Sequence, residues 1–359
     1  MTRLKLPGII DAHVHLRDPG DVHKEDFYTG TAAALAGGVV AVLDMPNNPI
    51  PTVDAEALAE KKRAAAQKAL CDYGFYLGAS QDNFVHHHRL ARRVPGLKMY
   101  LDSTHGPLLI DDLPGMMRHF RKWPGSRPIL AHAEGRSAAQ AIVLALLYKK
   151  RLHLCHVARR AEIELIALAK RRTARITCEV TPHHLFLTGE DARCLGSLGY
   201  MRPTLGTAED REALWRHLDV VDVVASDHAP HTLEEKQADH APPGVPGLET
   251  ALPLLLTAVD QGRLSLPRLV ELTCIAPARI FGLSLGARTY VEVEAEDEYV
   301  IQGKDLFTRC RWTPFEGMRV KGRVRAVYLR GAKVYQDGQI LVQPGFGQNL
   351  FSTTTRRST

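Results

Sequence analysis

Short apolar runs recur along the chain, and segments in which apolar positions repeat with helical spacing separate most of them. Eight runs have the length and the β-branched content of buried strands: residues 9–15, 39–45, 73–79, 97–101, 128–133, 152–157, 176–180 and 220–226. The helical patterns lie at residues 53–68, 113–122, 138–148, 161–170 and 208–217. Because this alternation builds parallel βαβ units, it predicts an α/β fold, a (β/α)8 TIM barrel over residues 9–285.

The main alternative to a barrel is an open, doubly wound sheet. A nucleotide-binding sheet of that kind has a glycine-rich phosphate turn after its first strand. The residues at the end of the first run, DAHVHLRD at 11–18, contain no glycine, so the barrel is favoured.

The pattern changes beyond residue 286. Runs at 289–293, 298–301, 323–329 and 339–342 are typical of antiparallel strands joined by glycine turns such as Asp337-Gly338. We expect a small β subdomain formed mainly by residues 286–350, together with residues 1–8. Residues 351–359 are rich in Ser, Thr and Arg and are expected to form a flexible tail.

Composition is that of an ordinary globular protein, with 45% hydrophobic and 24% charged residues. There is no uncharged apolar stretch of about 20 residues that would cross a membrane, and the N-terminus lacks an apolar signal core. The six cysteines form no CxxC pair and favour buried thiols in a reducing compartment, so we expect a cytoplasmic location. The net charge of +6 is spread over clusters typical of solvated helix faces. It argues against nucleic-acid binding and suits a small anionic substrate.

Histidine is unusually frequent, with 17 residues, and its positions carry the chemical argument. Metal-ligating or basic side chains fall near the ends of the predicted strands in barrel order: His13, His15, Lys98, His132, His156 and Asp227. Residues i and i+2 of a strand face the same way, so His13 and His15 converge. Barrel enzymes place their sites at the carboxyl ends of the strands, and imidazole and carboxylate are zinc ligands. The sequence therefore predicts a metal centre at one mouth.

Each of these residues alone has a plain structural explanation. A single histidine on an apolar strand is more often a hydrogen-bonded core residue, Lys98 fits a strand edge, and Asp227 fits a helix cap. What argues against all three explanations together is the placement of every residue at the expected strand end.

Longer stretches identify a resemblance to the amidohydrolase superfamily and, within it, to dihydroorotases of the CAD type. They are DAHVHLRD (11–18), DMPNN (44–48), AHAE (131–134), CHVAR (155–159), CEVTPHHLFL (178–187), ASDHAPHTLEEK (225–236), PGVPGLET (243–250) and WTPFEG (312–317). The resemblance implies reversible cyclisation of N-carbamoyl-L-aspartate to L-dihydroorotate in pyrimidine biosynthesis. It also implies a homodimer and membership of a larger pyrimidine-synthesis polypeptide.

The resemblance also implies the metal ligands. One zinc is expected on His13, His15, Lys98 and Asp227, and a second on Lys98, His132 and His156, with Lys98 carrying a CO2-derived carbamate. A possible third zinc is expected on Cys155 and Glu179, with His156 as a bridging histidinate. From the residues alone Cys155 is as easily a core thiol, whereas a lone buried carboxylate at Glu179 is costly without a partner.

Substrate contacts are implied for Arg17, Asn47, Arg202 and His231 and for the backbone of Pro243 and Gly244, and Asp227 is implied as the general acid–base. The guanidinium fork suits a substrate carboxylate, which supports Arg17 and Arg202. For Arg202 an exposed loop charge is an equal alternative.

The loop after the fourth strand departs from the pattern of the resemblance. Such dihydroorotases have a mobile loop with a Thr-Phe pair at its tip, and here Thr104 is followed by His105. A histidine buries less apolar surface, so closure is expected to be weaker or different.

Two other functions are compatible with the pattern. A hydantoinase or allantoinase would share the metal ligands, and a catalytically silent dihydroorotase-like scaffold domain would share the fold. Retention of every metal ligand argues against the scaffold, and Arg17, Asn47 and Arg202 argue against the related hydrolases.

Overall fold

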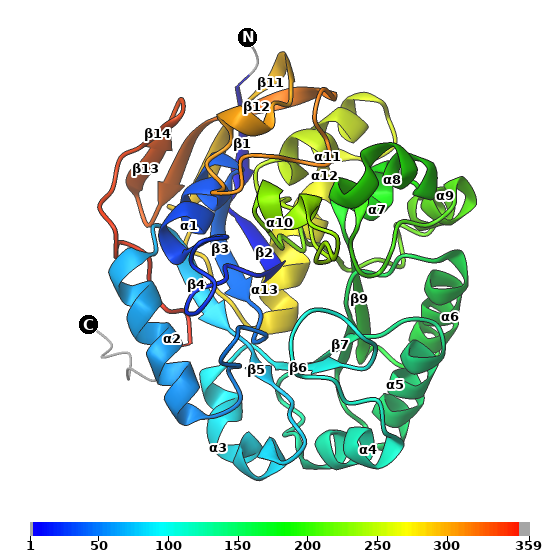
Figure 1. The fold of residues 1–359 in the computed structure, drawn as a ribbon. Coiled ribbons are helices and arrows are strands. Elements are labelled where there is room, and N and C mark those ends of the chain that lie inside the picture. Colours follow the sequence, from blue (N-terminus) through cyan, green and yellow to red (C-terminus); the bar gives the residue numbers. More distant parts are fainter. Residues whose placement is uncertain (1–2, 352–359) are drawn as a thin grey trace.

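The structure is a computed structural model that describes residues 3–351, and its centre is a ring of parallel strands surrounded by helices (Figure 1). The strands of the ring are β2 (Ile9–Val14), β3 (Val39–Asp44), β4 (Asp72–Phe75), β5 (Leu77–Gly78), β6 (Leu97–Tyr100), β7 (Ile129–His132), β8 (Leu152–Leu154), β9 (Ile176–Val180) and β10 (Val223–Val224). Neighbours pair in parallel from β2 to β4 and from β5 to β10. A parallel bridge between Val14 and His228 closes the ring, so the predicted barrel is confirmed.

Two of the predicted strands differ in detail. The third is split into β4 and β5 on either side of Tyr76, whose amide donates to the carbonyl of Asp44 at 3.1 Å. The eighth is only two residues long. It ends early because the amide of Ser226 donates to the carboxylate of Asp11, at 3.1 Å from Oδ2, instead of continuing the ladder.

Helices cover the outside of the barrel and lie in several of its loops: α1 (Phe27–Ala36), α2 (Ala55–Lys68), α3 (His87–Leu90), α4 (Leu113–Lys122), α5 (Arg136–Leu147), α6 (Arg160–Lys170), α7 (Pro182–Phe186), α8 (Gly189–Leu195), α9 (Ala208–Arg216), α10 (Leu233–Gln237), α11 (Ala251–Asp260), α12 (Leu266–Val270) and α13 (Ala276–Phe281). The five predicted helices are confirmed as α2, α4, α5, α6 and α9.

The helices that sequence reasoning missed share a physical cause. α1 and α11 bury most of their residues. A helix that is apolar all round has no amphipathic periodicity to reveal it. The others are mostly short, and some are recognisable only from caps such as Thr207, whose side chain accepts from the amide of Asp210.

An antiparallel sheet lies beside the barrel, in the order β1 (Arg3–Pro7), β11 (Tyr290–Val300), β12 (Arg319–Leu329), β13 (Ala332–Gln336) and β14 (Gln339–Ile340). The two strands predicted at 289–293 and 298–301 are one strand, β11, interrupted by a register shift between Glu294 and Glu298. β13 was not predicted. Of the tail predicted at 351–359, residues 352–359 lie outside the described residues.

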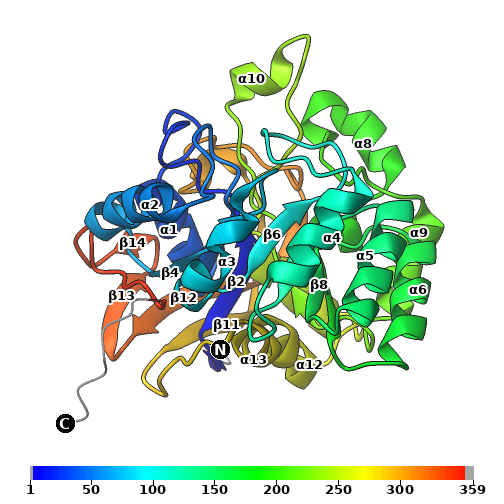
Figure 2. The same cartoon turned by 90° about the horizontal axis from the view of Figure 1, so that it is seen from below.

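Seen from the side, α10 and several loops project beyond one end of the barrel (Figure 2). The polar residues predicted at the strand ends lie at that mouth. None of the helices within residues 3–351 has the length and apolar character that a membrane span needs.

Candidate metal centre

The end of β2 brings two histidines to one carboxylate. Asp227 Oδ1 lies 3.2 Å from Nε2 of His13 and 3.2 Å from Nε2 of His15. Burial raises the pKa of Asp227, while His13 and Lys98 act in the opposite direction. Burial lowers the pKa of both histidines, so their rings are neutral and offer lone pairs. This is the donor set that a divalent metal requires.

The backbone beside these side chains is held in an uncommon conformation. Asp227 has φ 46° and His156 has φ 35°, in the left-handed region that side chains other than glycine rarely adopt. Such residues persist where surrounding contacts fix them. Here the amide of His15 donates to the carbonyl of His228 at 2.7 Å and fixes the segment that carries Asp227.

A second group of candidate ligands comes from β7 and the end of β8. His132 Nδ1 lies 2.9 Å from His156 Nε2. Nε2 of His132 and Nδ1 of His156 are buried and have no hydrogen-bond partner among residues 3–351. Burial holds the pKa of both rings well below the usual range. Two neutral imidazoles with free nitrogens at a buried site fit a metal ion better than an apolar core, where an unpaired polar atom is costly.

Lys98 lies between the two groups. Its side chain is completely buried, and Nζ lies 3.1 Å from Cys155 Sγ. Within the described part of the chain no carboxylate lies within ion-pair distance of this amine. A buried ammonium without a counter-charge is costly, so the position suits an amine that has been chemically modified.

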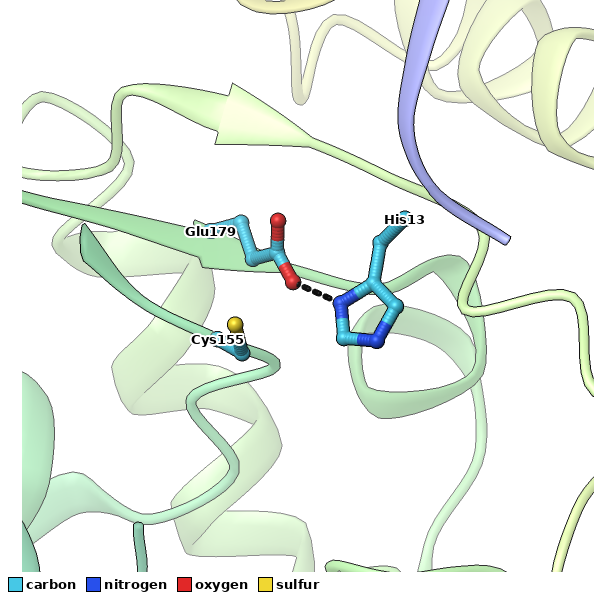
Figure 3. A group of neighbouring side chains, drawn as sticks. All are labelled: His13, Cys155 and Glu179. Carbon is cyan, nitrogen blue, oxygen red and sulfur yellow. Dashed lines mark hydrogen bonds and ion pairs between the residues drawn. The ribbon is translucent and has the colours of Figure 1, made fainter. Parts of the chain in front are cut away.

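A third group surrounds Glu179 on β9, as Figure 3 shows. The ligand atoms of His13, Cys155 and Glu179 all lie within 4.8 Å of one another. Glu179 Oε1 contacts Nδ1 of His13. The expectation that His156 is the histidine shared with this group is therefore corrected to His13. The physical reason is that the two nitrogens of His13 face opposite ways, Nδ1 towards Glu179 and Nε2 towards Asp227.

Two polar residues of the centre were missed from the sequence. His153 Nε2 lies 3.0 Å from the other oxygen of Glu179. Asp11 accepts from the amides of His13 and Ser226, and burial raises its pKa to about 7. A buried acid or histidine inside an apolar strand was the available sign, and both residues stand in such strands, β8 and β2.

A pocket of about 390 Å³ opens over these ligands. Its lining includes most of the predicted site residues: His13, His15, Arg17, Asn47, Lys98, Thr104, His105, His132, His156, Arg202, Asp227, Pro243 and Gly244. Tyr100 also lines it and was not predicted. The hydroxyl of Tyr100 is buried and lacks a hydrogen-bond partner among the described residues, so it is free for a ligand.

The predicted substrate-binding residues contact one another around this pocket. Arg17 Nη2 lies 3.0 Å from Nε2 of His231, and that nitrogen lies 3.1 Å from the carbonyl oxygen of Pro243. Asn47 Oδ1 lies 2.7 Å from Nδ1 of His15. Arg202 is exposed at the rim, with Nε 3.4 Å from the hydroxyl of Tyr200. Two guanidinium groups therefore flank one opening.

The loop after β6 lies against the same opening. The side-chain amide of Asn47 donates to the carbonyl of His105 at 3.0 Å. The ring of His105 lies edge-on to that of His231, with centroids 5.5 Å apart. Burial, and then Arg17, lowers the pKa of His105 to about 4, so the ring is neutral near pH 7.

The barrel and its histidine-rich mouth define the chain as an enzyme of the amidohydrolase class, and residues 4–106 match the Amidohydrolase family. A dihydroorotase from Pyrococcus furiosus is 36% identical over 352 residues, which cover 94% of this chain and 83% of that protein. The chain belongs to the dihydroorotase family, which confirms the resemblance.

The Multifunctional protein CAD of Squalus acanthias is 51% identical over 348 residues. The alignment covers 97% of this chain but 16% of that protein, so the chain corresponds to one region of a much longer polypeptide.

Solved structures support the same fold. L-Hydantoinase (dihydropyrimidinase) from Arthrobacter aurescens has a TM-score of 0.91 at 26% identity, over 97% of this chain and 89% of that one. The inactive dihydroorotase-like domain of a Chaetomium thermophilum CAD-like multifunctional protein has a TM-score of 0.84 at 28% identity, over 98% of this chain and all of that one (100%).

Proposed function

We propose that the chain is a zinc-dependent dihydroorotase that interconverts N-carbamoyl-L-aspartate and L-dihydroorotate in pyrimidine biosynthesis. The observation that carries the proposal is one pocket lined by both the metal-ligand set and two arginines. A ring amide is the group to be cleaved, and a carboxylate on that ring is the group that Arg17 and Arg202 would bind.

The residues fit two zinc ions, with the ligands divided as the sequence predicts. His13, His15, Lys98 and Asp227 would hold one, and Lys98, His132 and His156 would hold the other. A third would lie among His13, Cys155 and Glu179. Buried neutral imidazoles with unpartnered nitrogens support this assignment, since zinc binds neutral imidazole.

Lys98 would carry a carbamate formed with CO2. The modification turns a buried amine into an anion with two oxygens, enough for one oxygen to face each metal position. It would also remove the unpaired positive charge that burial disfavours.

When bound, a zinc pair supplies Lewis acidity towards a carbonyl and lowers the pKa of a water. Asp227 takes a proton from the attacking water and delivers it to the leaving ring nitrogen. Contact of Oδ1 with His13 and His15 holds the carboxylate in place for this transfer. Burial raises the pKa of Asp227 and brings it closer to the range in which a general acid–base works. Arg17 and Arg202 orient the substrate carboxylate, and the loop with Thr104 and His105 limits access of water.

A hydantoinase is the second candidate, and the likeness to L-hydantoinase favours it. Its substrates lack the ring carboxylate of dihydroorotate, so two arginines at one opening would have no anion to bind. The likeness to an inactive domain favours a silent scaffold, against which the complete ligand set argues.

The test measures turnover in both directions by the purified chain supplied with zinc and bicarbonate. Asp227→Ala and Lys98→Ala should abolish it, while the exposed Asp219→Asn and Lys149→Ala should not. Arg202→Met should raise KM for dihydroorotate about 10- to 100-fold, as expected for loss of a charged hydrogen bond. Hydantoin turnover without dihydroorotate turnover would establish the hydantoinase. Absence of both turnover and bound zinc would establish the scaffold.

We also propose a homodimer, in the cytoplasm, as part of a larger pyrimidine-synthesis polypeptide. Exposed apolar side chains on α5 and α6, namely Val143, Leu146, Leu147 and Leu168, support an interface there. Light scattering of wild type and Leu147→Glu tests it, and a monomeric wild type would contradict it. The division into a barrel at 9–285 and a β subdomain at 286–350 with 1–8 is likewise a proposal.

A further inference from the structure

Glu25 is a completely buried carboxylate that lies just before α1 and joins three separate segments. It accepts from the hydroxyls of Thr29 and Thr308 and from the amide of Arg309, at 3.2 Å from Oε1. Its Oε2 lies 3.3 Å from Nε2 of His228. A buried carboxylate is tolerated when donors surround it, and these contacts supply them from α1, from the segment before β12 and from the barrel mouth.

The contacts of His228 fix the protonation of its ring. The amide of Gly247 donates to Nδ1 at 3.1 Å, so this nitrogen must hold a lone pair. The proton of the neutral ring is then on Nε2, where it is donated to Glu25. Glu25 and Gly247 therefore hold the ring from opposite sides.

His228 directly follows Asp227, and its backbone is tied on both sides. Its carbonyl accepts from the amide of His15 at 2.7 Å, and bridges join His228 to Val14 and to Val245. A fixed His228 thus limits where Asp227, with its φ of 46°, can point. It also ties down the start of the segment 243–250, whose Gly244 lines the pocket.

We propose that Glu25 is a positioning residue that acts through His228 to aim Asp227, while the opposite edge of the same ring holds the segment 243–250. Thr308 and Arg309 make the C-terminal segment a support of the barrel mouth through Glu25. The proposal rests on the proposed function only for its kinetic readout.

Two substitutions of His228 separate the two sides of the ring. In His228→Asn the amide oxygen replaces Nδ1 and keeps the contact with Gly247, but the side chain is too short to reach Glu25. In His228→Gln the longer amide nitrogen keeps the contact with Glu25 and loses the one with Gly247. Glu25→Ala removes the carboxylate, and Asp26→Asn is the matched control. Asp26 neighbours Glu25 and contacts the Arg309 side chain, and asparagine retains its helix cap.

Glu25→Ala and His228→Asn should lower kcat about 10- to 100-fold with little change in KM, as expected for a misaimed catalytic group. The double variant should lose no more than either single one. His228→Gln should mainly raise KM, and Asp26→Asn should behave as wild type. Loss of thermal stability with unchanged kcat and KM in all variants would overturn the proposal, as would equal losses in Asp26→Asn.

A second readout does not depend on turnover. Cobalt(II) added to the metal-free chain should give an absorption spectrum that reports the ligands of His13, His15 and Asp227. Glu25→Ala and His228→Asn should shift this spectrum alike, and Asp26→Asn should not. If wild type shows no dihydroorotate turnover, the proposed function fails and the cobalt spectra still decide the positioning role. Unchanged spectra in Glu25→Ala would overturn it.

Discussion

The ammonium of Lys61, in the middle of α2, lies 2.6 Å from Oδ2 of Asp44 at the end of β3, and both side chains are almost completely buried. Lys61 also donates to the carbonyl of Met45 and to Oδ1 of Asn48, each at 2.6 Å. The other oxygen of Asp44 accepts from the amide of Leu16 at 2.7 Å. This ion pair holds the backbone on either side of the mouth, next to Arg17 and Asn47.

Removal of one partner should be strongly destabilising. Lys61→Met leaves Asp44 as an uncompensated buried charge, which typically costs about 3–5 kcal/mol of unfolding free energy. Adding Asp44→Asn should recover part of the loss, because the amide oxygen still accepts from Leu16. Urea unfolding measures both, with the exposed Arg63→Met as control. A loss below about 1 kcal/mol in Lys61→Met would contradict a buried, paired ammonium.

A buried histidine pair predicts a loss of stability in acid. His87 Nε2 lies 3.3 Å from His119 Nδ1, and His119 Nε2 lies 2.9 Å from the carbonyl of Ser80. Burial lowers the pKa of His87 to about 3 and that of His119 to about 4. Both rings are neutral in the folded state and bind protons in the unfolded state below about pH 6.5, so stability is lost as the pH falls from there towards about 4.

The slope of this loss is the measurable quantity. Each ring should contribute about 1.4 kcal/mol per pH unit below the unfolded pKa. His87→Gln keeps a donor towards His119 and removes one titrating ring, so its unfolding free energy should fall less steeply than that of wild type. The exposed His88→Gln should keep the wild-type slope. Equal slopes in all three chains would show that His87 is not a buried neutral ring.

His105 tests the departure in the loop after β6. Its backbone carbonyl holds Asn47, a contact that any side chain would keep, whereas its ring packs against His231. His105→Phe should therefore keep KM for dihydroorotate within about threefold of wild type, and His105→Ala should raise it about tenfold through loss of ring packing. A larger defect in His105→Phe than in His105→Ala would mean that a ring nitrogen, and not the packing, is what matters.

Much of the barrel and of the mouth is encoded in local patterns. Buried parallel strands are continuous apolar runs, and the ligands stand at their ends, so His13, His15, Lys98, His132, His156 and Asp227 could be found by position alone. α1 and α11 escaped because they bury nearly every face, which leaves no periodicity to detect.

What could not be predicted depends on which way a side chain turns. Assigning the shared histidine to His156 instead of His13 is one such error, because strand order says nothing of where the two ring nitrogens point. His153, Asp11 and Glu25 are similar cases. Their partners lie far away in the sequence, with Thr308 following Glu25 by 283 residues.

The group of His13, Cys155 and Glu179 predicts a change in zinc content. Replacing Cys155 by serine or Glu179 by glutamine removes one donor from a set of three, so each variant should bind about one zinc per chain fewer than wild type. Because Glu179 also contacts the ring of His13, Glu179→Gln should lower activity about 10- to 100-fold even where the other zinc ions stay bound. Elemental analysis together with kcat measures both effects, and Cys178→Ser, a change at another buried thiol, is the control. An unchanged zinc content in both variants would show that His13 and Glu179 form a hydrogen-bonded pair without a third metal.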